Sequence, residues 1–335
     1  MARTLIVILT VAVSSFAGIL GDETVRPAIL EAIECRFDHR FARADSIIDS
    51  LAAEFPHDPA PLFLRGSNLY DEMMHREDYS EVSRMNAILD SAIFSARTNT
   101  VDPWNLWIVG SALGYKAMAK IKLGKYLAGY GTSRDALGYL KLALDSPETR
   151  ADAALGAGGY YYWASATIGF LRYLPLVSDN RDEGLDLLRE AYDGSHFSRY
   201  AAGHAMVYIF INRNELDSAR VYRDTIAERF PESLLPLWYN LAIAEAEKSL
   251  ENYYTAAHAL ASALDTLGDE QIVNFVEVHH FAAMSAKDLT LWDKAIYHCD
   301  KVLNAIEDDE LSRRFRSQAK DCEAIRKTAI ERMGE

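Results

Sequence analysis

Apolar residues recur along this chain at spacings of three and four, in segments of ~12 to 20 residues separated by short polar stretches. This spacing is typical of amphipathic helices that bury one face. The alternation of Val, Ile and Thr with hairpin turns that marks strands is absent. Several prolines fall where a predicted helix has just ended: Pro56, Pro103, Pro147 and Pro231. The pattern therefore predicts an all-α fold.

One form recurs within these predicted helices. A bulky residue is followed three positions later by a small one, and then by apolar residues, as Phe41 is followed by Ala44, Ile48 and Leu51. The small residues that anchor the copies are Ala44, Ala87, Ala136, Gly184, Ala219, Ala256 and Ala295. The helix before many copies carries its own small residue, at Gly66, Gly110, Gly158 or Ala242. Facing small residues let two helix axes approach to about 8 to 9 Å, so we expect antiparallel helix pairs.

Such a pair cannot bury its apolar face alone, so pairs of this kind stack into a superhelix. The pattern resembles the tetratricopeptide repeat (TPR) family over about residues 27–305. The best copy runs from Asn214 to Ala242, with Leu216, Ala219, Ile226, Pro231, Trp238, Leu241 and Ala242 at signature positions. The resemblance implies an α-solenoid of about six to seven helix pairs with a capping helix, which binds a protein or peptide in its concave groove.

The spacing of the copies is irregular. Successive anchors lie 43, 49, 48, 35, 37 and 39 residues apart, whereas the family period is about 34. We therefore expect one irregular solenoid domain over residues 22–335, whose first half has room to bend back on itself. Within it we expect longer, irregular repeats over 27–200, more regular repeats over 201–305 and a C-terminal capping helix over 308–333.

Residues 1–20 have the composition of a secretory signal peptide. Arg3 precedes a nearly unbroken apolar stretch from Leu5 to Val13, and Ser15 and Ala17 have the spacing that a signal peptidase recognises. The alternative is an uncleaved anchor helix, but ~15 apolar residues are fewer than the ~20 that span a bilayer. No cysteine follows closely, so a lipoprotein anchor is not indicated. We expect an exported chain, periplasmic or secreted.

The charge balance bears on the class of partner. The chain has 35 basic and 49 acidic residues and a net charge of −14, which repels phosphate backbones and anionic lipid. We identify no basic stripe interleaved with aromatic residues, so we expect no nucleic-acid partner. No later segment has ~18 uninterrupted apolar residues, so we also expect no stable membrane insertion after the signal is removed. The oligomeric state is left open.

The three cysteines are too few for a disulfide framework in an exported protein. Cys299 and Cys322 fall on two consecutive predicted helices at similar distances from the turn between them. Two alternatives stay open for this pair: a disulfide bond, or two separately buried thiols.

An aromatic run, Tyr160-Tyr161-Tyr162-Trp163, follows the glycine-rich stretch 156–159. Four consecutive helical residues sweep about 300° around the axis and cannot all face one core. Either the helix is enclosed on several sides, or one or two rings line a binding groove. For a protein or peptide partner the candidate binding residues are Tyr161, Trp163, Tyr200 and Trp238. The alternative function is binding of a small molecule or saccharide through an aromatic pocket around Tyr160–Tyr173.

The sequence contains no catalytic motif, and we expect no enzyme activity, cofactor or metal. Glu72 with His75, and Glu277 with His280, have the Glu-x-x-His spacing of di-iron sites. In an extended stack these two pairs would lie tens of ångströms apart, so we expect them not to meet. His279 and His280 with Glu277 and His298 could form a surface zinc site, but the H-E-x-x-H spacing is absent.

The stretch Asp179-Asn180-Arg181-Asp182-Glu183 resembles a calcium loop only superficially, because it lacks the glycine and the distal glutamate of that motif. Asn180 with Glu183 three positions later forms a capping box. We therefore predict that Asn180 caps the following helix through its side chain.

Overall fold

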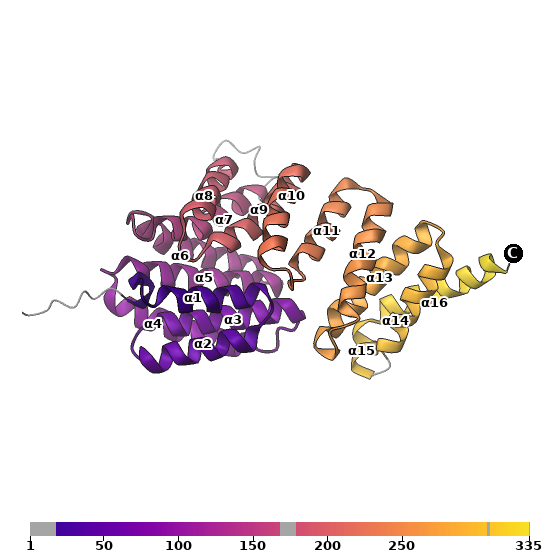
Figure 1. The fold of residues 1–335 in the computed structure, drawn as a ribbon, viewed down its shortest axis with the longest axis horizontal. Helices are drawn as coiled ribbons and strands as arrows, with labels where there is room; N and C mark the ends of the chain where they lie inside the picture. Colours follow the sequence, from indigo (N-terminus) through magenta and orange to yellow (C-terminus); the bar gives the residue numbers. More distant parts are fainter. Residues whose placement is uncertain (1–17, 168–178, 307–308, 335) are drawn as a thin grey trace, which may run out of the picture.

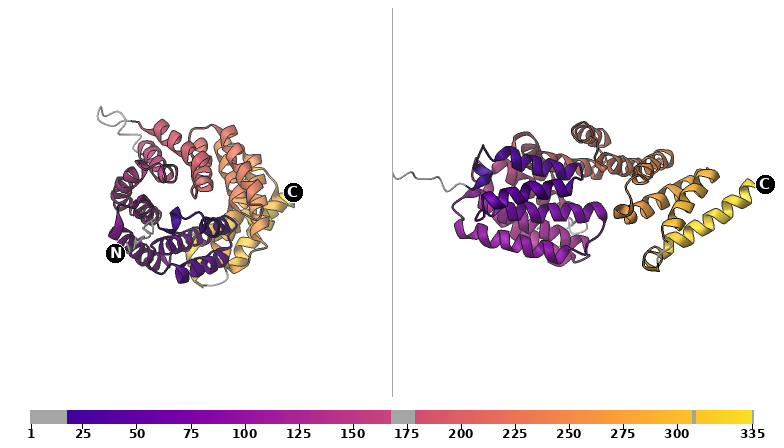
Figure 2. Two further views of the ribbon diagram at one scale, coloured as in Figure 1. Left: turned by 60° about the vertical axis from the view of Figure 1, so that its left-hand side comes forward. Right: turned by 60° about the horizontal axis from the view of Figure 1, so that its bottom comes forward.

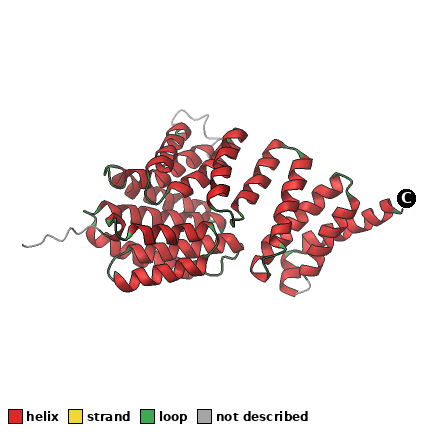
Figure 3. Cartoon of the chain, in the orientation of Figure 1, coloured by secondary structure: helices red, strands yellow, loops and turns green. Residues whose placement is uncertain are grey.

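A computed structural model of the chain describes residues 18–167, 179–306 and 309–334. Most of the expected signal peptide and the part of the aromatic segment around Tyr173 lie outside these residues. The described residues are helical and contain no strand (Figure 3), which confirms the prediction of an all-α fold for this part of the chain.

The described α-helices follow one another through the whole sequence (Figure 1). They are α1 (Arg26–Phe37), α2 (Phe41–Glu54), α3 (Ala60–Arg76), α4 (Val82–Ala96), α5 (Pro103–Lys122), α6 (Tyr126–Leu144), α7 (Arg150–Thr167), α8 (Arg181–Gly194), α9 (Arg199–Asn212), α10 (Leu216–Arg229), α11 (Leu235–Glu247), α12 (Leu250–Leu264), α13 (Ile272–Asp288), α14 (Trp292–Ala305), α15 (Asp309–Arg314) and α16 (Arg316–Met333). Short 3-10 helices include η1 (Ile19–Gly21), η2 (Arg97–Asn99) and η4 (Asp269–Gln271).

The helix ends follow from local chemistry. Asp102 caps α5 by accepting a hydrogen bond from the backbone N–H of Trp104 at 2.9 Å. Pro103 follows the end of η2 by four residues and is also the first residue of α5. Asn180 stands at the N-cap of α8 as predicted, but its side chain makes no capping hydrogen bond, so the capping-box mechanism is wrong. Instead its backbone N–H donates to Ser165 Oγ at 3.1 Å.

Each helix from α1 to α14 packs against its neighbours in sequence, and the alternate helices α1, α3, α5, α7, α9 and α11 also contact one another in order. Small residues mark several of the crossings. Gly158 of α7 faces Gly184 of α8 so closely that a Cβ built on Gly158 would lie 2.6 Å from the Gly184 carbonyl oxygen. At the crossings of α3 with α4 and α5 with α6, Gly66 meets Leu89 and Gly110 meets Leu140. The predicted pairing of small residues is confirmed for α7 and α8.

The predicted anchor positions differ in how well they match the core. Ala44, Ala136, Ala219 and Ala295 are all buried. Ala87 is exposed, and Met85 and Leu89 face the core of α4 in its place. The sequence pattern was therefore placed on the wrong face of this helix. Met85 and Leu89 are spaced by four and satisfy the helical period equally well.

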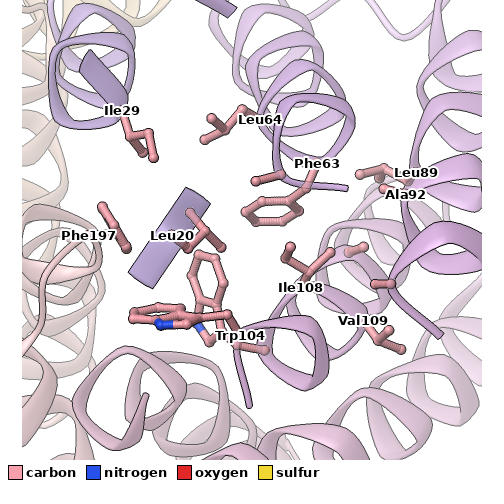
Figure 4. Packing of buried hydrophobic residues seen from close by; sticks show 14 of the residues in the cluster. Leu20, Ile29, Phe63, Leu64, Leu89, Ala92, Trp104, Ile108, Val109 and Phe197 are labelled. Atoms are coloured by element: carbon pink, nitrogen blue, oxygen red, sulfur yellow. The ribbon is translucent and has the colours of Figure 1, made fainter. Parts of the chain in front are cut away.

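The largest core extends across α1 to α7. Leu20, Phe63, Leu64 and Trp104 lie together in it, and Phe197 joins them from the segment between α8 and α9 (Figure 4). Separate clusters of buried residues lie between α7 and α11, between α11 and α13, and between α13 and α16. A chain of adjoining cores, each between successive helices, is consistent with an α-helical repeat.

The helices follow a closed turn, so that late helices return to the first ones (Figure 2). Arg229 at the end of α10 pairs with Glu34 of α1 at 2.5 Å, and Phe230 stacks on Phe37 with ring centres 5.0 Å apart. Further along, the Asn274 Nδ2 of α13 donates to the backbone oxygen of His75 at 2.7 Å. Elements about 195 residues apart in sequence are thus in direct contact.

The C-terminal region begins close to where it was predicted but is not one helix. Phe315, which is 2% exposed, separates α15 from α16 and packs in the last core cluster. The long helix α16 contacts both α13 and α14. None of the helices among the described residues combines the length and the apolar character that crossing a membrane requires.

Candidate functional site

The aromatic run lies on α7, and its rings differ in burial. Tyr162 is fully buried and its hydroxyl donates to Asn212 Oδ1 at 2.8 Å. Tyr160 and Tyr161 are half-buried, and Trp163 is 40% exposed. The helix is therefore covered on one side, where Tyr162 points into the core, while Trp163 reaches the surface.

The four candidate binding residues fall on three helices. Tyr161 and Trp163 lie close together on α7, and Lys141 Nζ lies 5.6 Å from the Tyr161 ring centre. Tyr200 of α9 packs edge-on against Phe230 with ring centres 4.8 Å apart. Trp238 of α11 is half-buried against the core cluster that contains α12. Tyr200 and Trp238 therefore pack within interfaces between helices. Of the four candidates, Trp163 alone is an exposed side chain.

A different surface carries more exposed apolar area. Among the described residues, ten of the seventeen large hydrophobic side chains that are exposed lie between Phe94 and Trp163. Six of these ten surround the turn between α5 and α6, and we name this group the apolar tip: Met118, Ile121, Leu123, Tyr126, Leu127 and Tyr130. Leu127 is 92% exposed and Tyr126 68%. Contiguous exposed apolar residues of this kind are characteristic of interaction sites.

The local sequence explains why the chain turns at this point. Gly124 adopts a positive φ of 75°, its N–H donates to the Ile121 oxygen at 2.9 Å, and the Lys125 N–H donates to the Lys120 oxygen at 2.8 Å. These two bonds form a Schellman motif, which ends α5. In α6, a Cβ on Gly129 would lie 2.5 Å from Ile121, so glycine at this position lets the two helices close up. The motif presents the flanking apolar residues at the end of a tight helical hairpin.

The segment around the apolar tip has a net positive charge, whereas the chain as a whole is negative. Residues 103–144 contain six basic residues and one acidic residue, whereas the whole chain has a net charge of −14. Lys122 reaches Glu77 of the α3–α4 loop at 2.8 Å, and the neighbouring Lys125 is exposed. The net charge of the whole chain conceals this basic segment. Counting charge helix by helix would have found it.

A second group of polar residues lies between α12, α13 and α14, and we name it the histidine cluster: His258, His279 and His298. His298 Nδ1 lies 2.9 Å from His279 Nδ1, and His298 Nε2 lies 3.1 Å from His258 Nδ1. Because each nitrogen of His298 faces a different ring, the three rings form a hydrogen-bonded chain and do not converge on one point. Burial lowers the pKa of His279 to about 4 and that of His298 to about 3.

The expected separation of the two Glu-x-x-His pairs is wrong. The closed turn brings α13 against α3, so that the segments of both pairs are in contact. Their side chains nevertheless have separate partners: Glu72 pairs with Arg76 of its own helix at 2.9 Å, and His280 faces Asp321 of α16 at 3.2 Å. Within the described residues, no group of three or more His, Cys, Asp or Glu side chains is arranged to hold a metal ion.

A partly buried charged group joins α1, α3 and α5. The Arg36 guanidinium donates to Asp71 Oδ2 at 2.7 Å through Nε and to the Tyr115 hydroxyl at 2.9 Å. Burial raises the pKa of Asp71, and Arg36 opposes this shift. The hydrogen bonds within this group connect three packed helices to one another.

Cys299 and Cys322 are both buried free thiols in adjoining helices. Interaction with the Cys299 thiol is the largest cause of the raised pKa of Cys322, so the two thiols are neighbours. They are therefore adjacent and not separately buried. Cys35 is buried in the first core, away from this pair.

No protein-family model matches this chain, and no curated protein matches it.

Proposed function

We propose that this protein is an exported, non-enzymatic scaffold that binds a protein partner. In this proposal the helices α1 to α14 form seven antiparallel pairs of a TPR-like solenoid, and α15 and α16 cap its end. The contacts between successive helices and between alternate helices support this assignment, because stacked helix pairs produce both kinds of contact. Irregular pair lengths in the first half would account for the uneven spacing of the sequence copies.

The observation that carries the binding proposal is the apolar tip. Leu127 and Tyr126 together expose large apolar side chains at the end of the α5–α6 hairpin, next to Lys122 and Lys125. Aromatic and aliphatic residues at the centre of an interface supply most of its binding energy. Basic residues at the rim steer an oppositely charged partner. The partner that fits is a protein surface with an apolar pocket and acidic residues around it.

The groups with shifted pKa values support a role without catalysis. The low pKa values of His279 and His298 arise first from burial inside a helix interface. Asp71 is tied to Arg36. These groups are held by packing and hydrogen bonds between helices, whereas a catalytic acid or base needs access to a substrate.

The test begins with a photo-cross-linker placed at residue 127 of the full chain in its native cell. Mass spectrometry identifies the cross-linked protein, which is then purified and titrated against the chain. Leu127→Asp should weaken binding about tenfold or more. Because residue 127 is almost fully exposed in the first turn of α6, an acidic residue suits the helix dipole there and leaves the fold intact.

Val221→Asp is the matched control, because Val221 is 62% exposed on α10, outside the apolar tip. The same loss of affinity in both variants, or in neither, would refute docking through the tip. The purified chain is also mixed with vesicles of phosphatidylglycerol and phosphatidylcholine. Vesicle binding that Leu127→Asp abolishes would replace the protein partner with a membrane surface.

Two further variants test the binding residues predicted from the sequence, Trp163 and Trp238. Trp163→Ala tests the exposed ring of α7. If free glycans stabilise the unsubstituted chain but not this variant, the saccharide alternative is favoured over a protein partner. If Trp238→Ala weakens binding while the tip variants bind as tightly as the unsubstituted chain, the binding site lies in the concave groove.

A further inference from the structure

Residues 18–20, which the sequence suggested were part of the signal peptide, pack into the domain. Ile19 and Leu20 begin the short helix η1 and are 5% and 1% exposed. Leu20 lies among the core residues near Trp104 and Phe197 (Figure 4). A protease that removed these two side chains would take apolar residues out of the largest core. Ile19 and Leu20 therefore belong to the folded domain.

Two carboxylates hold the backbone at this point. Asp102 Oδ2 accepts a hydrogen bond from the Gly18 nitrogen at 2.9 Å, and Asp58 Oδ2 accepts one from the Ile19 nitrogen at 2.9 Å. The other oxygen of each carboxylate accepts a backbone N–H at the start of a helix, at 2.9 Å for Asp102 before α5 and 2.8 Å for Asp58 before α3. Both carboxylates are thus oriented by helix caps, and Asp102 is 8% exposed.

The surroundings of Gly18 are negative and polar. A cavity of about 280 Å³ lies beside it, and its lining includes both carboxylates together with Ser95, Asn99 and Asn105. Among the described residues that line this cavity there is no lysine or arginine, and the only basic side chain is that of His57. A partly buried pair of carboxylates is stabilised by a cation between them. A free α-ammonium group on Gly18 would supply that cation, with three hydrogen-bond donors where an amide nitrogen has one.

The residue types on both sides fit a cut before Gly18. Ser15 and Ala17 have the spacing of small residues that a signal peptidase recognises, and the bond after Ala17 is the one such a peptidase would cut. A Cβ on residue 18 would lie 3.0 Å from Asp58 Oδ2, so glycine lets the new terminus approach the carboxylates closely.

We infer that a signal peptidase cuts the chain between Ala17 and Gly18, and that the Gly18 α-ammonium formed by the cut binds Asp58 and Asp102. Water adds its oxygen to the Ala17 carbonyl carbon and the bond to the Gly18 nitrogen breaks. The resulting acid gives its proton to the amine, which leaves a carboxylate on the released leader and –NH₃⁺ on Gly18. The inference rests on the export that the proposed function includes, but not on the partner.

The first experiment is made on the full chain with its own leader, expressed in a Gram-negative host. Intact mass and N-terminal sequencing of the exported protein should give a chain that begins at Gly18. A retained leader, or a first residue other than Gly18, would overturn the inference. This result is independent of the tip variants that test partner binding.

The second experiment measures the bound ammonium itself. A chain that begins at Gly18 is compared with the same chain acetylated on the Gly18 nitrogen, which keeps an amide N–H and removes the charge, as an uncut leader does. At pH 7 the free amine should raise the folding equilibrium constant about tenfold over the acetylated form. Equal stability of the two forms would overturn the role of the ammonium.

Variants and pH locate the effect. Asp102→Asn keeps an oxygen for the α5 cap and should remove most of the difference between the two forms, as should Asp58→Asn. Asp145→Asn, which changes an exposed aspartate after α6, should leave the difference unchanged.

An α-amine has a pKa of about 8 in an unfolded chain. Two carboxylates raise it in the folded chain, so the extra stability should be complete below about pH 8 and disappear as the pH rises through the folded value.

Discussion

Substituting Gly158 by alanine tests whether small residues set the approach of α7 and α8. A Cβ at this position would lie 2.6 Å from the Gly184 carbonyl oxygen, whereas ordinary contacts begin at 3.4 Å. The two helices would have to separate by about 0.8 Å. The obstacle is backbone and cannot rotate away as a side chain could, so the cost should lie near the upper end of the 1–3 kcal/mol range of overpacking, at about 3 kcal/mol.

The helix itself offsets part of this cost. Alanine in a helix interior is favoured over glycine by about 1 kcal/mol, so the Gly158→Ala chain should be destabilised by about 2 kcal/mol net. Gly159 provides a neighbouring control, because a Cβ built there meets nothing within 4 Å. Gly159→Ala should stabilise the chain by about 0.5–1 kcal/mol through helix propensity alone. Two adjacent substitutions of the same chemical kind should thus have opposite signs.

The assay is equilibrium unfolding in urea, followed by circular dichroism, with the free energy obtained by linear extrapolation. Hydrogen exchange of the amides of α7 and α8 shows whether the loss is local to this pair of helices. A Gly158→Ala chain as stable as the unsubstituted chain, or a Gly159→Ala chain that loses as much, would refute the reasoning that the close helix crossing requires glycine.

Three further outcomes follow from the described contacts. As the pH falls from about 6.5 to about 5, the free energy of unfolding should decrease by up to about 2 kcal/mol for each buried histidine such as His279. The unfolded side chain binds a proton in this range, while the folded one, with a pKa of about 4, does not. Urea titrations at each pH check this. Asn274→Ala should cost about 1–3 kcal/mol of stability, because it leaves the backbone oxygen of His75 without its donor. The surface substitution Arg76→Gln should cost less than about 1 kcal/mol. Equal losses would show that the hydrogen bond from Asn274 does not tie α13 to α3. Mild oxidation of the folded chain should form a disulfide bond between the adjacent thiols of α14 and α16, which mass spectrometry detects as the loss of two hydrogen atoms. Cys299→Ala should prevent this loss. An unchanged mass would mean that the two sulfurs cannot reach bonding geometry.

The candidate site was only partly accessible to sequence reasoning. The aromatic run was found, and its mixture of buried and exposed rings follows from four consecutive residues on one helix. The apolar tip was missed, because Leu127 and Tyr126 fit the apolar pattern of a core helix as well as that of an exposed one. Periodicity identifies which residues share a face, but another element of the fold decides whether that face is covered.

The sequence by itself determined the class of fold and much of the local structure. Apolar spacing, helix caps and small residues act over a few turns of helix, so the all-helical architecture and the close crossing of Gly158 with Gly184 could be predicted from neighbouring residues. The exposed Ala87 marks the limit of this approach, since Met85 and Leu89 fit the same helical period.

Only the tertiary structure decided how far the helices turn. The path of the chain is the sum of small rotations between successive helix pairs, each set by how side chains fill one interface. Small differences add over many pairs, so the sequence predicted a stacked solenoid in which the Glu-x-x-His pairs of α3 and α13 stay about five repeat units apart. The structure instead closes the turn, and Asn274 reaches His75. In the same way, the burial of Leu20 among residues of α3, α5 and the segment before α9 places residues 19–20 in the domain, because only packed helices form the interior that Leu20 fills.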